Sequence, residues 1–312
     1  MTHLLPEELI SLNDGVITFG IVGPTRSGKS LFIKKLSSFL LRDKLDENIL
    51  PIVESGKNIC TIQTAFVPKK PVKLNFEDKE LTLQFLECVG YKIHGIKGLK
   101  SDRVYVEGYK SPVNVTTAIA IQLQMAINTL CHYSFVVITD GSIGEFPRFS
   151  YIDAEKDILR DIKLLEKPFI VVLNTVEPNA DHVRALKEQI EKEYKTFVIS
   201  CDVNQVSNEE MNIMMNELLD AYPIKEVNIN IPLKVLELQE NHPKRELYQN
   251  TIKDVVRNLN TFRSINSVIE LFSSYDFIEK AEVSFRDKKL GILEIDIFEN
   301  MNNVFENNEM QS

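Results

Sequence analysis

The chain has 312 residues, which is enough for one large domain or two domains of ordinary size. Hydrophobic residues make up 44% of it and charged residues 26%, an ordinary composition for a soluble protein, and no uninterrupted apolar stretch approaches the roughly 20 residues that span a bilayer. The net charge of −9 argues against general nucleic-acid binding, because phosphate contacts need clustered Lys and Arg.

Apolar runs and amphipathic segments alternate from Val16 to about Pro223. The expected strands are Val16–Val22, Val72–Phe76, Leu81–Leu86, Ser134–Thr139, Phe169–Leu173 and Phe197–Ser200. The expected helices are Leu31–Leu36, Thr116–Leu130, Asp153–Leu165, Asp181–Tyr194 and Ser207–Leu219. Strands that alternate with helices predict an α/β fold, with a mostly parallel sheet and helices on both faces. We therefore assign residues 1–223 to one such domain.

The pattern changes after Pro223, and we predict a smaller α+β domain at residues 224–298. Its expected elements are a half-exposed strand at Lys225–Pro232, helices at Lys244–Leu259 and Ser264–Tyr275, and a hairpin of Ala281–Phe285 with Gly291–Phe298. Residues 299–312 are rich in Asn and Glu and contain few apolar residues. We expect them to be a disordered tail.

A complete phosphate-binding motif, G-P-T-R-S-G-K-S, lies at Gly23–Ser30 between the first expected strand and the first expected helix. This order of strand, loop and helix is the context that a P-loop requires, so we predict that the chain binds a nucleoside triphosphate. Lys29 can reach the β- and γ-phosphates, and the Ser30 hydroxyl can ligate Mg²⁺. The residues expected to bind the nucleotide through this motif are Gly23, Arg26, Ser27, Gly28, Lys29 and Ser30.

Two further segments have the form of metal-site and switch elements. Glu87–Gly90 ends an apolar strand with the pattern acid-x-x-Gly, in which the acid of GTPase-like proteins supports Mg²⁺ and the glycine senses the γ-phosphate. Glu87 is therefore a predicted catalytic and metal-site residue, although Asp is usual there. The polar stretch Ser55–Thr64 occupies the place of a first switch loop, where Thr61 or Thr64 would contact Mg²⁺ and the γ-phosphate.

The base-recognition position of GTPases, N-K-x-D after a strand, corresponds to N-T-V-E at Asn174–Glu177. Asn174 fits the pattern and is a predicted nucleotide-binding residue. Thr175 replaces the lysine that covers the base, and Glu177 replaces the aspartate that accepts two hydrogen bonds from guanine. This altered guanine signature leaves both ATP and GTP open as the nucleotide.

Six segments of the chain together resemble one family. They are Val22–Ser30, Phe66–Pro68, Glu87–Tyr91, Thr139–Arg148, Lys167–Val176 and Glu226–Asn230. This combination resembles the stage IV sporulation protein A family, the coat-morphogenetic ATPases of endospore-forming bacteria. The segment Thr139–Arg148, T-D-G-S-I-G-E-F-P-R, is the most distinctive, because ordinary GTPases do not carry it. The similarity extends from about Val16 to about Phe298.

The resemblance implies a GTPase-like P-loop domain followed by a middle domain and a C-terminal domain. It also implies ATP and Mg²⁺ as ligands, and ATP hydrolysis that drives self-association into a basement layer over the forespore. Spore coat or forespore-surface proteins would be the partners. By position, Lys29 and Ser30 are the P-loop pair, Glu87 takes the acidic metal-site position, and Thr61 falls at the first of two adjacent threonines credited with sensing nucleotide.

Three departures from the family pattern bear on turnover. Glu87 stands where the family has Asp, Ile62 replaces the second sensing threonine, and the sequence stops soon after the middle domain, as a short paralogue or a truncated product would. We expect an ATPase. Two alternatives stay open: a nucleotide-gated interaction module with little turnover, which Glu87 and Ile62 motivate, and a GTPase, which Asn174 and Glu177 motivate.

The sequence also bears on the compartment. Four widely spaced cysteines without a C-x-x-C pair favour reduced thiols in a cytoplasm, and the N-terminus lacks the basic and apolar regions of a signal peptide. The expected location is therefore cytoplasmic. By family resemblance, it is the mother-cell side of the forespore surface.

Overall fold

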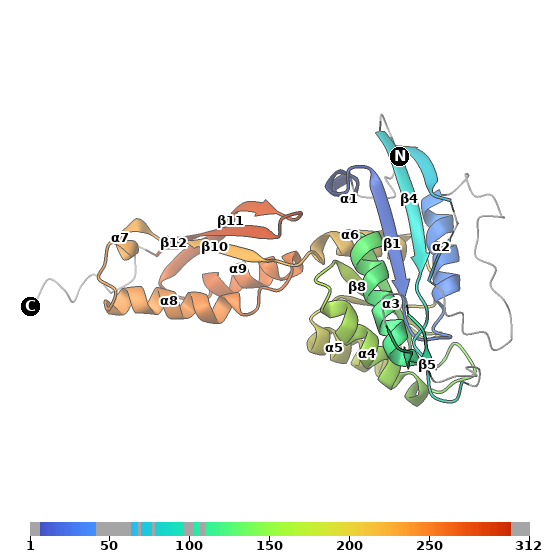
Figure 1. Ribbon diagram of the computed structural model, residues 1–312. Coiled ribbons are helices and arrows are strands. Elements are labelled where there is room, and N and C mark those ends of the chain that lie inside the picture. The colour runs from blue at the N-terminus through green and yellow to red at the C-terminus, as the bar shows by residue number, and fades with distance from the viewer. Residues whose placement is uncertain are drawn as a thin grey trace, which may run out of the picture. The chain divides into compact units, whose positions relative to one another are not determined.

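The computed structural model describes residues 7–41, 64–67, 70–76, 79–96, 103–106 and 110–300. The chain divides into two compact units, Met1–Ala221 and Tyr222–Ser312 (Figure 1). Glu299, the first residue of the predicted tail, ends a strand, and residues 301–312 lie outside the described residues.

The first unit is built on a mostly parallel sheet, as predicted. Its parallel strands are β1 (Val16–Val22), β4 (Lys79–Glu87), β7 (Tyr133–Thr139), β8 (Phe169–Asn174) and β9 (Val198–Cys201), in the spatial order β4-β1-β7-β8-β9. Two short strands, β2 (Ala65–Phe66) and β3 (Val72–Phe76), pair antiparallel with β4. Because parallel strands end at the same edge, the loops after β1, β4, β7 and β8 meet there.

Helices cover both faces of this sheet, which confirms the predicted fold class (Figure 1). One face carries α2 (Lys29–Leu41) and α6 (Asn208–Asp220), and the other carries α3 (Val115–Leu130), α4 (Ile152–Lys163) and α5 (Asp181–Tyr194). The alternation along β7 explains the two layers: the Phe135 ring lies 5.0 Å from the Phe32 ring of α2, whereas Val136 belongs to the core under α3 and α4.

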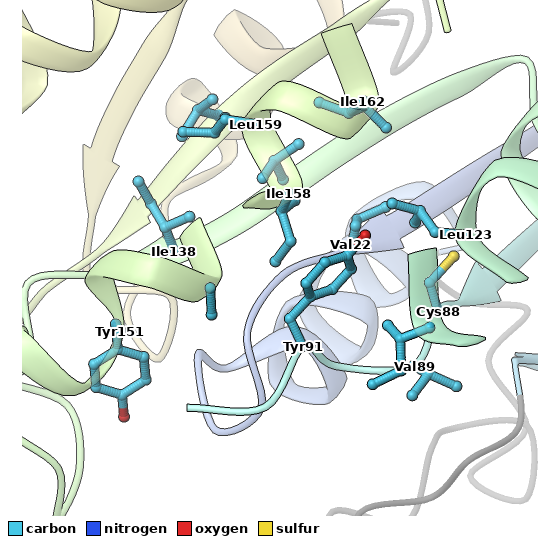
Figure 2. Close-up of a cluster of buried hydrophobic side chains, with 14 of the residues drawn as sticks. Val22, Cys88, Val89, Tyr91, Leu123, Ile138, Tyr151, Ile158, Leu159 and Ile162 are labelled. Atoms are coloured by element: carbon cyan, nitrogen blue, oxygen red, sulfur yellow. The ribbon is translucent and has the colours of Figure 1, made fainter. Parts of the chain in front are cut away.

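A large apolar cluster fixes the helices on the second face (Figure 2). It brings Leu123 of α3 and Ile158 and Ile162 of α4 together with Val22 and Ile138 at the carboxyl ends of β1 and β7. All five side chains are at most 2% exposed. Burying one such side chain stabilises the fold by about 1.5–3 kcal/mol, so this cluster holds α4 firmly beside the loops at the sheet edge.

Five short elements of the described part of the first unit were not predicted. They are α1 (Glu7–Leu12), the strand β2, the two-stranded pair of β5 (Arg103–Val104) with β6 (Val113–Asn114), and a 3-10 helix at Arg148–Ser150. Elements of two to six residues carry too little periodicity to be recognised from sequence.

The second unit is a smaller α+β fold. Its sheet has the order β10-β12-β11, in which β10 (Glu226–Asn230) runs parallel to β12 (Ile292–Glu299), and β11 (Ile278–Asp287) forms the predicted hairpin with β12. Its helices are α7 (Leu233–Leu236), α8 (Pro243–Val256) and α9 (Ile265–Ser273). The helix predicted to reach Leu259 ends at Val256, because backbone N–H groups at Asn258 and Leu259 already form three-residue turns.

Two expectations about the compartment can be compared with the described residues. Cys88, Cys131 and Cys201 are buried free thiols, and Cys60 lies outside the described residues. No helix in the described part of the chain has the length and apolarity that crossing a bilayer requires.

The carboxyl end of α3 is capped by a lysine from another segment. The last turn of α3 has no basic residue of its own. Lys167, just before β8, donates hydrogen bonds from Nζ to the carbonyl oxygens of Ile127 (2.8 Å), Asn128 (2.7 Å) and Cys131 (2.7 Å). The Ile127 carbonyl oxygen also accepts from the Cys131 N–H (3.3 Å), so the Lys167 ammonium is a second donor there. A cation at this position compensates the negative end of the helix dipole.

We predict that Lys167→Met lowers the free energy of unfolding by about 1–3 kcal/mol, because it removes a charged donor that three carbonyl oxygens at the end of α3 share. Lys163→Met, at an exposed position on α4, is the matched control and should change stability by less than about 0.5 kcal/mol. Urea unfolding followed by circular dichroism measures both. Equal midpoints for the two variants would contradict the capping role.

Candidate nucleotide-binding site

The loop Gly23–Ser30 joins the carboxyl end of β1 to α2, which begins at Lys29. The backbone φ is positive at Gly23 (155°), Arg26 (68°) and Gly28 (98°), so the chain curls around the N-terminus of the helix. Backbone N–H groups at a helix N-terminus favour a bound anion. The predicted motif therefore lies in the expected context of strand, loop and helix.

Two glycines of this loop leave no room for a side chain. A Cβ at Gly23 would lie 2.1 Å from the carbonyl oxygen of Val137, and one at Gly28 would lie 2.3 Å from the amide nitrogen of Asn174. Beneath the loop, the Ser27 hydroxyl is fully buried and has no hydrogen-bond partner in the described residues. The close backbone packing and the unsatisfied hydroxyl both fit a loop that holds phosphate groups.

The Lys29 side chain is buried within the loop. The residue is 7% exposed, and Nζ donates to the carbonyl oxygens of Gly23 (3.1 Å) and Pro24 (2.7 Å). These bonds fold the side chain back over the loop, away from solvent. An ammonium in this position raises the attraction of the loop for phosphate oxygens.

Ser30 and Glu87 meet at the predicted metal site. The Ser30 hydroxyl, in the first turn of α2, donates to Glu87 Oε1 at the end of β4 over 2.5 Å. The additional methylene of Glu, compared with the usual Asp, therefore does not prevent contact. Hydroxyl and carboxylate oxygens are ligands that Mg²⁺ accepts, together with water and substrate phosphates. The described ranges contain no group of three or more His, Cys, Asp or Glu suited to a metal ion. The roles of Ser30 and Glu87 as metal ligands stay a prediction.

The segment after Glu87 is held against the phosphate-binding loop. The Thr25 N–H donates to the carbonyl oxygen of Tyr91 (2.8 Å), and the Thr25 hydroxyl lies 3.2 Å from the Gly90 carbonyl oxygen. A Cβ at Gly90 would lie 2.8 Å from Lys29 Nζ, so only glycine fits there. The Tyr91 hydroxyl in turn donates to Asp161 Oδ2 on α4 over 2.7 Å. The glycine predicted to sense the γ-phosphate is thus next to the P-loop lysine.

Asn174 contacts the protein with both ends of its amide. Nδ2 donates to the carbonyl oxygen of Ser27 (3.1 Å), and Oδ1 accepts from the N–H of Val203 (3.1 Å). The side chain is 2% exposed. In this geometry Asn174 positions the phosphate-binding loop. Its predicted contact with the nucleotide stays untested.

The predicted first switch falls largely outside the described residues. Thr61 and Ile62 are among those outside, and Thr64 is the residue before β2. Because Ala65 pairs with Glu87 across β2 and β4, Thr64 lies at the same sheet edge as the Ser30–Glu87 pair. Of the two candidate threonines, Thr64 is therefore the one that the described backbone brings near the metal site.

Comparison with known proteins identifies the family. The family model described as the ATPase domain of stage IV sporulation protein A matches residues 5–223, and the model of its middle domain matches residues 224–309. The chain belongs to the stage IV sporulation protein A family.

Individual members of this family cover most of the chain. It is 30% identical to the stage IV sporulation protein A of Bacillus anthracis and to that of Bacillus subtilis, in each case over 94% of the chain and 62% of the relative. It is 29% identical to the stage IV sporulation protein A of Clostridioides difficile, over 95% of the chain and 63% of the relative. The chain thus spans less than two thirds of the length of these relatives, and the resemblance predicted from its motifs is confirmed.

The segment that most resembles the stage IV sporulation protein A family, Thr139–Arg148, forms the loop after β7. Asp140 accepts from the Ser142 hydroxyl (2.6 Å) and from the Thr175 hydroxyl (2.7 Å), with His182 Nε2 3.5 Å away. Burial acts to raise the pKa of Asp140, but these hydrogen bonds outweigh it and lower the pKa. An ionised Asp140 therefore ties the loop after β7 to the loop after β8.

A buried ion pair closes the other end of that segment. Arg148 Nη1 donates to the carbonyl oxygen of Thr139 (2.9 Å) and pairs with Glu155, which is 3% exposed. Burial raises the pKa of Glu155 to about 7, although the nearby Arg148 acts to lower it. A Cβ at Gly141 would lie 2.5 Å from the Arg148 N–H nitrogen, so the turn is tight. The segment is a closed loop fixed at both ends.

Sequence reasoning missed Thr25, Tyr91, Asp161 and Glu155 as residues that shape the site. Tyr91 had a usable signal, because it follows the acid-x-x-Gly segment directly. Asp161 and Glu155 lie on α4, where an acidic residue looks solvated until the helix is placed on the sheet. Their sequence spacing to Tyr91 and Arg148 carries no recognisable pattern.

The Glu155 carboxyl makes stability depend on pH. Its pKa is raised by folding from 4.5 to about 7, so the stability it contributes is complete below about pH 4.5 and is lost as the pH rises through about 7. We predict that the free energy of unfolding of the wild-type protein, relative to Glu155→Gln, falls by about 3 kcal/mol between these limits. Urea unfolding at steps of one pH unit measures it.

Glu145→Gln is the control for this pH series. Glu145 lies in the same segment and is exposed, so this variant should follow the wild-type curve. Parallel curves for the wild type and Glu155→Gln would show that Glu155 does not carry the dependence.

Proposed function

We propose that this chain binds ATP with Mg²⁺ at Gly23–Ser30 and hydrolyses it to ADP and phosphate. The observation that carries the proposal is the convergence of the Lys29 ammonium, the Ser30 hydroxyl and the Glu87 carboxylate at one loop, with the last two 2.5 Å apart. The match of the family's ATPase domain to residues 5–223 supports it.

The reaction is an in-line displacement at the γ-phosphate. A water oxygen forms a bond to the γ-phosphorus, the bond from that phosphorus to the β–γ bridging oxygen breaks, and ADP leaves with the electron pair while a proton passes to solvent. Lys29 stabilises the negative charge that develops on the phosphate oxygens. A bound Mg²⁺ supplies further charge neutralisation, and Ser30 and Glu87 are the residues to hold it, directly or through water.

ATP is the proposed nucleotide because both guanine-reading positions are changed. Thr175 is fully buried and donates its hydroxyl to Asp140, so it offers no side chain to cover a base as lysine does. Glu177 is exposed, and its N–H donates to the Thr175 hydroxyl over 3.2 Å. The family to which the chain belongs is also described by an ATPase domain.

The biological role that we propose follows the family. ATP turnover in this chain drives self-association and contributes to the basement layer of the spore coat, on the mother-cell side of the forespore surface. Spore coat or forespore-surface proteins are the proposed partners. Because the chain spans 62% of its Bacillus relatives, self-association is the part of the role that needs its own measurement.

Phosphate release with ATP and with GTP, measured in parallel, tests the activity. We expect release from ATP to exceed release from GTP, and Lys29→Ala to lower the rate with ATP by about 100-fold or more, since a phosphate-stabilising charge is lost. Lys34→Ala, an exposed lysine on the same helix, is the matched control and should keep the wild-type rate.

Three other outcomes would contradict parts of this proposal. Nucleotide binding without phosphate release would reject the enzyme and favour the nucleotide-gated interaction module. Faster release from GTP would favour the GTPase. An equal rate for Lys29→Ala and the wild type would reject Gly23–Ser30 as the site.

The Mg²⁺ dependence of phosphate release tests Glu87. We predict that Glu87→Gln raises the Mg²⁺ concentration for half-maximal rate by about 10- to 100-fold, because a neutral amide supports the metal less well. Glu87→Asp, the residue usual in the family, should restore much of the affinity. Unchanged Mg²⁺ dependence in Glu87→Gln would mean that Glu87 does not support the metal.

A further inference from the structure

Arg26 is a second cation of the phosphate-binding loop, and its side chain is not engaged by any of the described residues. Its backbone φ is 68°, which is a left-handed conformation. Glycine adopts this conformation without strain, whereas arginine is strained in it. The residue is exposed and forms no hydrogen bond or ion pair with the described residues. A strained position that carries a long charged side chain, three residues before Lys29, points to a function at this loop.

The other basic groups around the loop are already engaged. Lys29 donates to the carbonyl oxygens of Gly23 and Pro24, and Arg148 is paired with Glu155 and the Thr139 carbonyl. Among the described residues around the loop, Arg26 is therefore the basic side chain that remains able to move onto a ligand. Its guanidinium has five N–H donors in a fork that matches two phosphate oxygens.

A buried hydroxyl lies within reach of the charge of Arg26. Tyr151, at the start of α4, is fully buried, and its hydroxyl has no hydrogen-bond partner in the described residues. Figure 2 shows its ring at the edge of the apolar cluster, with the hydroxyl directed away from Ile158 and Ile162. Burial raises the pKa of Tyr151 and so does Glu155, whereas the positive charge of Arg26 acts to lower it.

We infer that Arg26 acts in cis on the phosphates of the bound nucleotide, and that the Tyr151 hydroxyl accepts a hydrogen bond from its guanidinium and positions it there. One edge of the guanidinium can bind Tyr151 while the other meets phosphate oxygens. Both unsatisfied groups then gain partners in the same step. The inference rests on the proposed function, because it concerns the same nucleotide site.

The catalytic consequence follows from the charge distribution of the reaction. As the bond to the β–γ bridging oxygen breaks, negative charge accumulates on that oxygen and on the β-phosphate. An arginine placed on this charge accelerates phosphoryl transfer by about 10³- to 10⁵-fold in other P-loop enzymes. Arg26 is thus a catalytic residue, and Tyr151, which acts through it, is a positioning residue.

Arg26→Ala tests the catalytic part with two measurements. Phosphate release from ATP should fall by about 100-fold or more at saturating nucleotide, and the affinity for ADP with aluminium fluoride, a mimic of the transferring phosphoryl group, should fall strongly. The affinity for ADP alone should change by less than about threefold, since arginine acts on the developing charge. Arg26→Lys should recover only part of the rate, because an ammonium lacks the planar fork.

Arg257→Ala is the matched control. Arg257 is an exposed arginine of the second unit that pairs with Asp254, so this variant removes an equal charge far from the site in sequence. It should keep the wild-type rate and the wild-type nucleotide affinities.

Tyr151→Phe tests the positioning part through a double-mutant cycle. We expect a loss of about tenfold in the rate of phosphate release in the wild-type background, and no further loss in the Arg26→Ala background, because the hydroxyl acts only through the guanidinium. Equal losses in both backgrounds would mean that Tyr151 has a structural role alone and would overturn this part.

The outcomes separate this inference from the proposed function. Wild-type rates in Arg26→Ala would overturn the inference and leave the ATPase standing. If the wild type binds ATP but releases no phosphate, the ATPase falls, and the inference is then judged by whether Arg26→Ala weakens ATP binding more than ADP binding; equal effects overturn it. If the wild type binds neither nucleotide, both fall.

Discussion

The side-chain amide of Asn174 holds the phosphate-binding loop in place. It donates to the Ser27 carbonyl oxygen over 3.1 Å and accepts from the Val203 N–H over 3.1 Å, so one buried residue connects the loop after β1 with the segment after β9. The amide comes so close to Gly28 that any Cβ there would lie 2.3 Å from it. The curvature of this loop decides where Lys29 points, and every other part of the site depends on it.

A second set of contacts fixes the opposite side of the same loop. Thr25 is bonded through its N–H to the Tyr91 carbonyl oxygen, and the Tyr91 hydroxyl is bonded to Asp161 on α4. Because α4 is anchored by the apolar core, this chain of hydrogen bonds connects the loop to a closely packed layer of the unit. The end of β4, where Glu87 meets Ser30, is thereby joined to α4 by a continuous set of contacts.

Local features of the sequence were enough to predict the longer strands and helices and the P-loop. Most side-chain contacts between segments far apart in the sequence could not be predicted in this way. The P-loop was recognisable because all its residues are adjacent, and the meeting of Ser30 with Glu87 followed from parallel strands that end at one edge. Glu155 was not recognisable, because an acid in the first turn of an amphipathic helix is normally solvated, and only the tertiary packing buries it against Arg148. Tyr151 was not recognisable for the same reason, because its neighbours along the chain do not indicate that its hydroxyl is buried without a hydrogen-bond partner.

The altered guanine signature at Asn174–Glu177 and the distinctive segment Thr139–Arg148 are in direct contact with each other. Thr175, which stands where GTPases have lysine, is buried and donates to Asp140, the second residue of that segment. A lysine at position 175 would bring a long cation to a place where the Asp140 carboxylate already accepts from Ser142 as well. The small hydroxyl satisfies the carboxylate at hydrogen-bond distance without displacing the loop. The absence of the lysine therefore has a physical reason within this chain, because the buried threonine allows the loop after β7 to close onto β8.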